Sequence, residues 1–122
     1  NAGAIVSQFL DEQDFAGVDV EYFRDLLEGV EQHCAQIDEE LGRYLDRVLD
    51  HVDPLERAIL RLSTFEMVHR LEVPVRVVLD EAVELARRFG SEQGHAFVNG
   101  VLDPMAKKTR KTELAQSQTP KE

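Results

Sequence analysis

The sequence lacks tryptophan, has one cysteine and contains no lysine before Lys107. The lone Cys34 excludes a disulfide within the chain and is typical of a reducing compartment, so we expect a cytoplasmic protein. No run of about 18 apolar residues occurs, and none of the scattered glycines follows a strand as a phosphate-binding loop would. These absences argue against a membrane span and against nucleotide chemistry.

The remaining composition is typical of a small globular domain with an acidic body. The chain has 122 residues, and 43% of them are hydrophobic, which is enough for one core. Residues 1–103 carry 9 basic and 22 acidic side chains, a net charge of −13, whereas residues 104–122 carry +3. Such a body repels phosphates at long range.

The strongest helix start is at Asp53-Pro54, since Asp is a favoured N-cap and Pro a favoured first helical residue. Glu56, three residues after the cap, is placed to reach back to the cap's own N–H. Apolar residues then recur at spacings of three and four, which predicts a helix to about Leu71 that Val73-Pro74 closes.

Two more helices are predicted after this one. The first begins at Val75 and carries an apolar face as far as Phe89, with Gly90 as the residue that ends it. Ser91 is the predicted N-cap of the second, which should run towards Pro104.

The rest of the chain predicts further helices and a tail. Residues 4–12 resemble the latter part of a helix, and a long helix starting after Asp19 should break near Gly42. No alternating pattern requires a strand, so the predicted fold is all-α. We expect one domain over residues 1–106 and a basic, polar, mobile tail over residues 107–122.

Nothing in the sequence predicts catalytic residues, a metal or a cofactor. His33 and Cys34 are adjacent, so on a helix they point to different faces and cannot act as a nucleophile and its base. His51, His69 and His95 lie far apart in sequence and lack metal-ligand spacing. Solvated helix faces explain the acidic clusters.

Two features on the predicted helices leave alternatives open. Gln93 and Phe97 share one face; Phe97 is either a core residue, with Gly100 letting another helix approach, or an exposed ring for stacking on a base. At the start of the Asp53 helix, Glu56, Arg57 and Arg61 form either a solvated face or a partner contact.

Three segments carry a family resemblance that covers about residues 9–103. They are Val18-Asp19-Val20-Glu21-Tyr22-Phe23-Arg24-Asp25-Leu26-Leu27, Glu56-Arg57-Ala58-Ile59-Leu60-Arg61-Leu62, and the stretch from Val73-Pro74-Val75 through Phe89-Gly90 to Phe97-Val98-Asn99-Gly100-Val101-Leu102-Asp103. In these segments the chain resembles the NusB family of bacterial transcription antitermination factors. The resemblance implies two small packed helical bundles and a binding protein rather than an enzyme, without cofactor or small-molecule substrate.

The resemblance also implies partners and site residues. A NusB-like protein pairs with the ribosomal protein NusE, binds boxA RNA of nascent ribosomal RNA transcripts, and joins an antitermination complex on RNA polymerase. By position, Gln93 and Phe97 correspond to RNA contacts, and Glu56 lies on the surface facing NusE. The family's arginine-rich motif lies in a first helix that we expect upstream of Asn1, and His95-Ala96 replace basic neighbours of Phe97.

Two other functions fit the same helices. The chain also resembles the amino-terminal RNA-recognition domain of a ribosomal RNA cytosine methyltransferase, which would require a following α/β domain with a glycine-rich cofactor loop. A purely protein-binding helical module is the third possibility. Salt-dependent binding of boxA RNA separates the first function from the third.

Overall fold

The computed structural model describes residues 20–118. Its elements are α2 (Val20–Gln32), α3 (Cys34–Gly42), the 3-10 turn η1 (Leu49–His51), α4 (Pro54–His69), α5 (Val75–Phe89), α6 (Gly94–Thr109) and α7 (Lys111–Gln118). No strand occurs in this range, and the all-α prediction is confirmed. The helix predicted at residues 4–12 lies outside the described residues. Within 20–118, no helix has both the length and the apolar character needed to cross a bilayer.

Helix α4 starts where its cap predicts. The Asp53 carboxylate accepts hydrogen bonds from the N–H groups of Leu55, at 3.1 Å, and Glu56, at 3.2 Å, and Pro54 occupies the first turn. The Asp side chain thereby satisfies two amides that have no partner inside the helix. The helix ends at His69, two residues before the predicted end.

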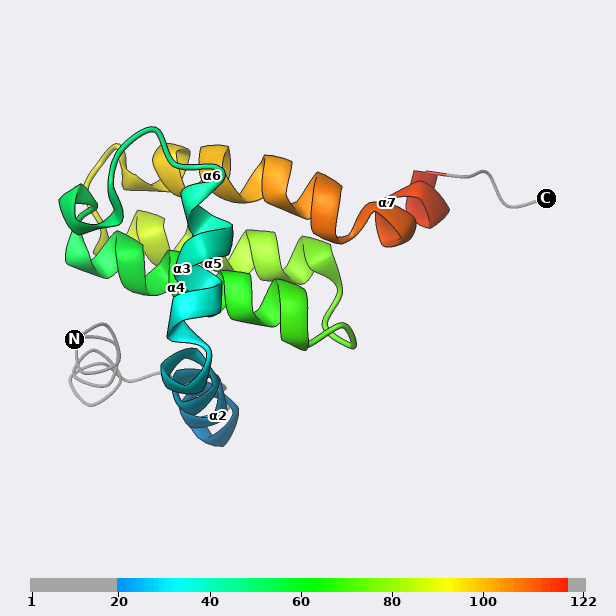
Figure 1. Cartoon of the computed structure of the whole chain (residues 1–122). Helices are drawn as coiled ribbons and strands as arrows, with labels where there is room; N and C mark the ends of the chain where they lie inside the picture. The colour runs from blue at the N-terminus through cyan, green and yellow to red at the C-terminus, as the bar shows by residue number, and fades with distance from the viewer. Residues whose placement is uncertain (1–19, 119–122) are drawn as a thin grey trace.

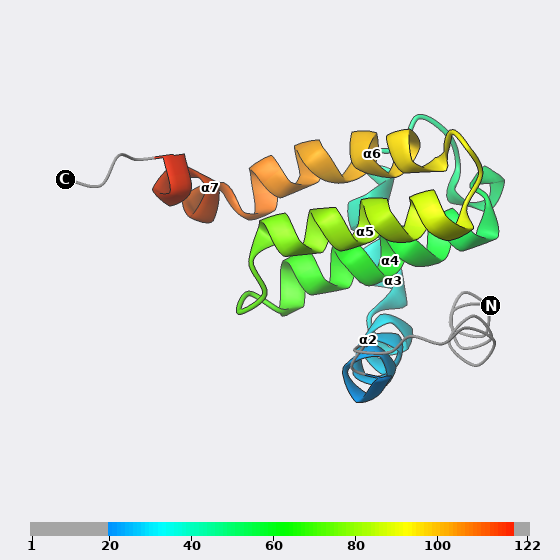
Figure 2. The same ribbon diagram turned by 180° about the vertical axis from the view of Figure 1, so that it is seen from behind.

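Helix α4 is the central element of the fold. Helices α5 and α6 pack on α4 and on each other. Helix α3 crosses α4, and α2 also packs against α4 (Figure 1; Figure 2 shows the view from behind). Because α4 is surrounded, Leu60, Thr64 and Met67 are fully buried. They lie outside the apolar stripe that helical spacing predicts, whose Val68 is exposed. That predicted stripe consists of Leu55, Ala58, Ile59, Leu62, Phe65 and Val68 or His69. Burial on several sides, rather than one amphipathic face, holds α4 in place.

The single helix predicted after Asp19 is two helices, α2 and α3, in the structure. The helix is interrupted at His33, which has a φ of −116° and a ψ of 21° and lies nine residues before Gly42. The His33 ring stacks on that of His69, with centroids 4.6 Å apart, and His69 in turn stacks on Phe65 at 4.9 Å. The break therefore coincides with a stack of rings that joins the α2–α3 corner to the end of α4.

The crossing of α2 over α4 depends on a glycine. A Cβ atom on Gly29 would lie 2.2 Å from Cζ of Phe65, far inside van der Waals contact, and both residues are buried. Only a residue without a side chain fits between the two helices at this point.

The predicted boundary after residue 106 differs from the structure. Helix α6 continues through Pro104 to Thr109, and α7 follows it. Between them, Arg110 is only 4% exposed. Its guanidinium donates to four main-chain carbonyl oxygens at the end of α4 and in the following turn, those of Glu66 (3.3 Å), Met67 (2.8 Å), Arg70 (3.0 Å) and Val73 (3.0 Å).

Glu113 of α7 completes this attachment. Its carboxylate pairs with Arg110 and also accepts the N–H of Val75, at 2.6 Å, in the first turn of α5. A carboxylate at a helix N-terminus is favoured by the helix dipole. Residues 107–118 are thus partly integrated into the domain rather than separate from it.

Candidate nucleic-acid and partner interface

The structure brings the three predicted site residues to one end of the molecule. Glu56 lies in the first turn of α4, Gln93 is the N-cap residue of α6, and Phe97 lies one turn further along α6. The N–H of Phe97 donates to the carbonyl of Gln93 at 3.2 Å. A Cβ on Gly94 would lie 2.7 Å from Oε2 of Glu56, so the starts of α4 and α6 are in contact. Residues 90–93, which connect α5 to α6, lead the chain to this contact.

Glu56 is not the open surface carboxylate that we expected. It is 7% exposed, and its Oε2 accepts a hydrogen bond from the hydroxyl of Ser91 at 3.2 Å. Ser91 therefore binds Glu56 instead of capping α6, whose N-cap Gln93 makes no side-chain cap. In this position Glu56 orders the loop ahead of α6, and its role in partner binding stays a prediction.

Phe97 lies between the buried and the exposed alternatives drawn from the sequence, and its stacking on a base stays a prediction. Its ring is half-buried and packs partly against the core, while Gln93 is exposed. The guanidinium of Arg47 lies over the ring, with its central carbon 4.6 Å from the centroid. The loop between α3 and η1 carries this arginine across to α6 and places a cation at the predicted RNA contact.

Arg47 was not among the site residues predicted from the sequence. Hydrogen bonding to Asp46, at 2.8 Å, raises the pKa of Arg47, and the charges of Asp46 and Glu56 act in the same direction. A lone arginine in a loop gives no periodic signal in the sequence. Its significance comes from the fold, which sets a planar cation on an aromatic ring where both can stack on a base.

No other described helix approaches α6 closely at Gly100, so that part of the core alternative is wrong. Among the described residues, no atom of another element lies within 4 Å of the Cβ position at Gly100, and the residue is exposed. Close approaches between helices occur instead at Gly29 and at Gly94. Helix α6 is therefore exposed at Gly100.

Arg57 and Arg61 are neither a solvated face nor an open partner surface. The Arg61 guanidinium makes two 2.8 Å hydrogen bonds to the Asp38 carboxylate, which raises the pKa of Arg61 and ties α3 to α4. Cys34 also contacts Asp38, with a sulfur to oxygen distance of 3.7 Å. Arg57 reaches the carbonyl of Leu49 at 3.5 Å. Both arginines brace the segment that precedes α4.

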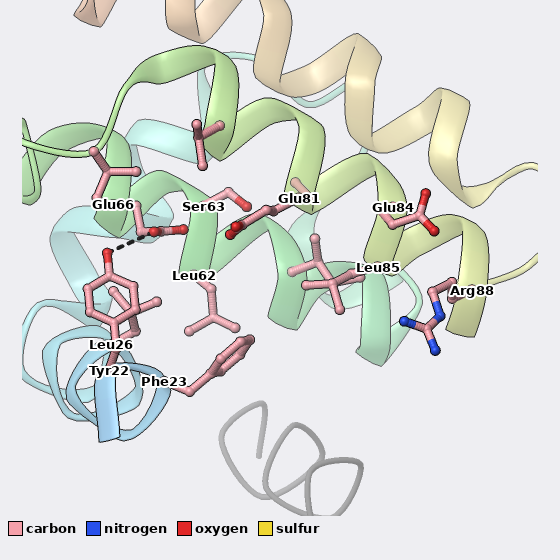
Figure 3. Close-up of a pocket in the computed structure, with 14 residues that line it drawn as sticks. Tyr22, Phe23, Leu26, Leu62, Ser63, Glu66, Glu81, Glu84, Leu85 and Arg88 are labelled. Atoms are coloured by element: carbon pink, nitrogen blue, oxygen red, sulfur yellow. Dashed lines mark hydrogen bonds between the residues drawn. The ribbon is translucent and has the colours of Figure 1, made fainter. Parts of the chain in front are cut away.

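A largely apolar groove of 440 Å³ lies between α2, α4 and α5 (Figure 3). Phe23, Leu62 and Leu85 contribute to its apolar lining. At one end the Tyr22 hydroxyl donates to Glu66 at 2.9 Å. Burial raises the pKa of Glu66, an effect that the Tyr22 hydrogen bond partly opposes, and burial likewise raises the pKa of Tyr22.

The described residues offer no group of three or more histidine, cysteine, aspartate or glutamate side chains able to hold a metal ion. His33 and His69 stack with their ring planes nearly parallel, at an angle of 25°. Burial, His33 and Arg70, in that order, lower the pKa of His69. This arrangement serves packing between α4 and the α2–α3 corner.

Comparison with known proteins gives a consistent result. The NusB family model matches residues 2–107. Transcription antitermination protein NusB of Xylella fastidiosa (strain 9a5c) is 50% identical over 113 residues, covering 93% of this chain and 72% of that protein. The protein of the same name from Nitrosococcus oceani is 55% identical over 102 residues, covering 84% and 69%. The solved structure of T. maritima NusB superposes with a TM-score of 0.74 at 34% identity, covering 93% of this chain and 80% of that one.

Proposed function

This chain belongs to the NusB family of transcription antitermination proteins, and we propose that it acts in antitermination by binding boxA RNA as a heterodimer with the ribosomal protein NusE. In this role it would act in the cytoplasm, on nascent ribosomal RNA transcripts, within a complex on RNA polymerase. The relatives at 50% and 55% identity are named as antitermination proteins, which favours this role over that of a methyltransferase domain.

The observation that supports RNA binding is the pairing of Arg47 with Phe97 beside Gln93. An aromatic ring with a guanidinium over it provides a stacking platform and a cation for the phosphate backbone in one place. Gln93 next to it is exposed and offers an amide that can donate and accept hydrogen bonds. The rest of the acidic body would repel RNA, so this end of α6 is where binding is best supported.

NusE is proposed to contact the neighbouring start of α4. A basic ribosomal protein would be steered by the net charge of −13 over residues 1–103. Because Glu56 is 7% exposed, it would act mainly by holding Ser91 and the 90–93 loop in the shape that the partner meets. Glu56→Gln should then weaken NusE binding less than a charge reversal, Glu56→Lys, which would also disturb the loop.

The test of RNA binding is a titration of boxA RNA with the chain, with and without NusE, using Phe97→Ala. If the ring stacks on a base, affinity should fall by about 1–3 kcal/mol. Phe23→Ala is the matched control, since Phe23 is also half-buried but lies on α2. Equal RNA affinities for Phe97→Ala and the wild type, with only the melting temperature lowered, would assign Phe97 to the core alone.

A further inference from the structure

The lysines of the chain are gathered at one end. All of them, Lys107, Lys108, Lys111 and Lys121, lie in the C-terminal segment, and the first three are exposed at the junction of α6 and α7. Lys107 pairs with Asp103 at 3.1 Å, but these side chains stay 70% and 48% exposed. Within residues 20–118, Lys108 and Lys111 have no ion-pair partner. Two or three ammonium groups are thus available to an anionic partner.

Lys108, in the last turn of α6, lies on the same side of that helix as Phe97. Lys108 follows Phe97 by eleven residues, which is close to three helical turns and a rise of about 16 Å. The residues between them on this side, Gly100 and Pro104, are exposed and uncharged. Among residues 20–118, no neighbouring side chain lies within 4 Å of the Cβ position at Gly100, so the path is open at this point. In Figures 1 and 2, α6 lies along one edge of the molecule and leads to α7.

The charges along α6 favour a polyanion over a protein partner. Asp103 is the single acidic residue in the α6 sequence, whereas residues 1–103 as a whole carry −13. Protein interfaces are poor in lysine and need an apolar centre. The exposed large hydrophobic residues of the described range, Val48, Val68, Leu71 and Val77, all lie outside α6 and α7. Phosphates, by contrast, need only the cations.

We propose that the exposed face of α6 is an extension of the RNA site, along which the RNA backbone runs from Phe97 to the phosphate-binding lysines Lys107, Lys108 and Lys111. This inference rests on the proposed RNA binding at Phe97 and adds a path and a second set of contacts to it. RNA that ends at the Phe97 contact does not reach the lysines, and RNA that extends beyond it does. The extension is read through its backbone and not its sequence.

The test uses the full chain with NusE and compares the boxA segment alone with the same segment extended by unpaired uridines. The extension is made at the 5′ end in one RNA and at the 3′ end in another. The variant Lys107→Gln/Lys108→Gln/Lys111→Gln removes the three charges, and the Lys→Arg triple variant at the same positions keeps them. Each phosphate contact on a single strand contributes about 0.7 to the slope of log K against log salt. Three contacts therefore give about a 20-fold larger loss of affinity between 50 and 200 mM salt.

We expect the wild type and the arginine variant to bind the extended RNA with the steeper slope. The glutamine variant should lose that extra slope, bind the short RNA as the wild type does, and melt at the same temperature. If the glutamine variant keeps the wild-type slope on the extended RNA, the α6 path is wrong although RNA binding stands. Loss of NusE binding in place of the slope would assign the lysines to a protein contact and overturn the proposal. Failure of the wild type to bind either RNA would instead remove the proposed function itself.

Discussion

Arg47 and Phe97 form a contact between a loop and a helix that are 50 residues apart in sequence, with the guanidinium carbon 4.6 Å from the ring centroid. While this contact stands, one face of the ring is covered by a cation. An incoming base can stack on the guanidinium plane or take its place on the ring. Either route would make the α3–η1 loop part of the proposed RNA-binding surface.

Replacing Arg47 by Gln should therefore weaken RNA binding and lower the salt slope by about 0.7, the contribution of one phosphate contact. Arg47→Lys keeps the charge but not the planar stack, so it should retain the slope and lose affinity. Arg43→Gln is the control, because Arg43 is exposed in the same loop and pairs with Glu40 at 2.8 Å, away from Phe97. If Arg47→Gln and Arg43→Gln have the same effect, Arg47 has no special role.

Arg110→Ala should be strongly destabilising. It leaves four carbonyl oxygens without their donor, and because a hydrogen bond to a charged group contributes about 1.5–3 kcal/mol, the loss should be about 3 kcal/mol or more. Glu113, whose side chain is 36% exposed, also loses its partner. Lys111→Ala, one residue on and exposed, should change the free energy of unfolding by less than about 0.5 kcal/mol. Urea denaturation measures both. A loss below about 1 kcal/mol for Arg110→Ala would mean that α7 contributes little to holding α4 and α5.

Two glycine substitutions should have opposite effects. In Gly29→Ala the new methyl group meets the Phe65 ring, and overpacking of this kind costs about 1–3 kcal/mol. In Gly100→Ala the methyl group enters open solvent on a helix, where Ala is favoured over Gly by about 1 kcal/mol. Thermal melts should show a lower midpoint for the first variant and a higher one for the second. A raised midpoint for Gly29→Ala would mean that α2 and α4 can move apart at no cost.

Glu66→Gln should stabilise the protein at neutral and alkaline pH. Burial raises the pKa of Glu66 above its unfolded value of about 4.3, so its favourable contribution is complete below that value and is lost as pH rises through the folded pKa. Glutamine stays neutral and can still accept the Tyr22 hydroxyl. The variant should melt above the wild type at pH 8, and the difference should vanish near pH 4. The exposed Glu72→Gln is the control, and a difference that does not change with pH would exclude this cause.

The elements with local signals were predicted well from the sequence. The Asp53 carboxylate caps α4, and the apolar face of α5 begins at Val75 and ends at Phe89 as predicted. These features depend on neighbours within one or two turns. The break at His33 was missed because the apolar pattern continues through it at helical spacing, while the break itself accompanies a ring stack with α4.

The misplaced residues are those whose environment is created by distant parts of the chain. Arg110 lies in a lysine-rich run, so the sequence predicts a solvated side chain. In the structure it is buried and donates hydrogen bonds to the carbonyl groups at the end of α4. Glu56 has the position of a capping-box residue, but its carboxylate accepts a hydrogen bond from the hydroxyl of Ser91, which lies in a different loop. Phe97 and Gln93 were predicted as site residues, whereas Arg47, which contacts Phe97 from a loop 50 residues away in sequence, was not.

The gathering of every lysine at one end of α6 and in the segment after it has a practical use. A lysine-specific protease can cut the polypeptide only there, and amine-reactive cross-linkers acting on side chains label only that end. Cleavage after Lys107 and Lys108, which lie in a helix, would be an internal footprint of whatever covers this face. Protection from the protease would then locate a bound molecule without any substitution.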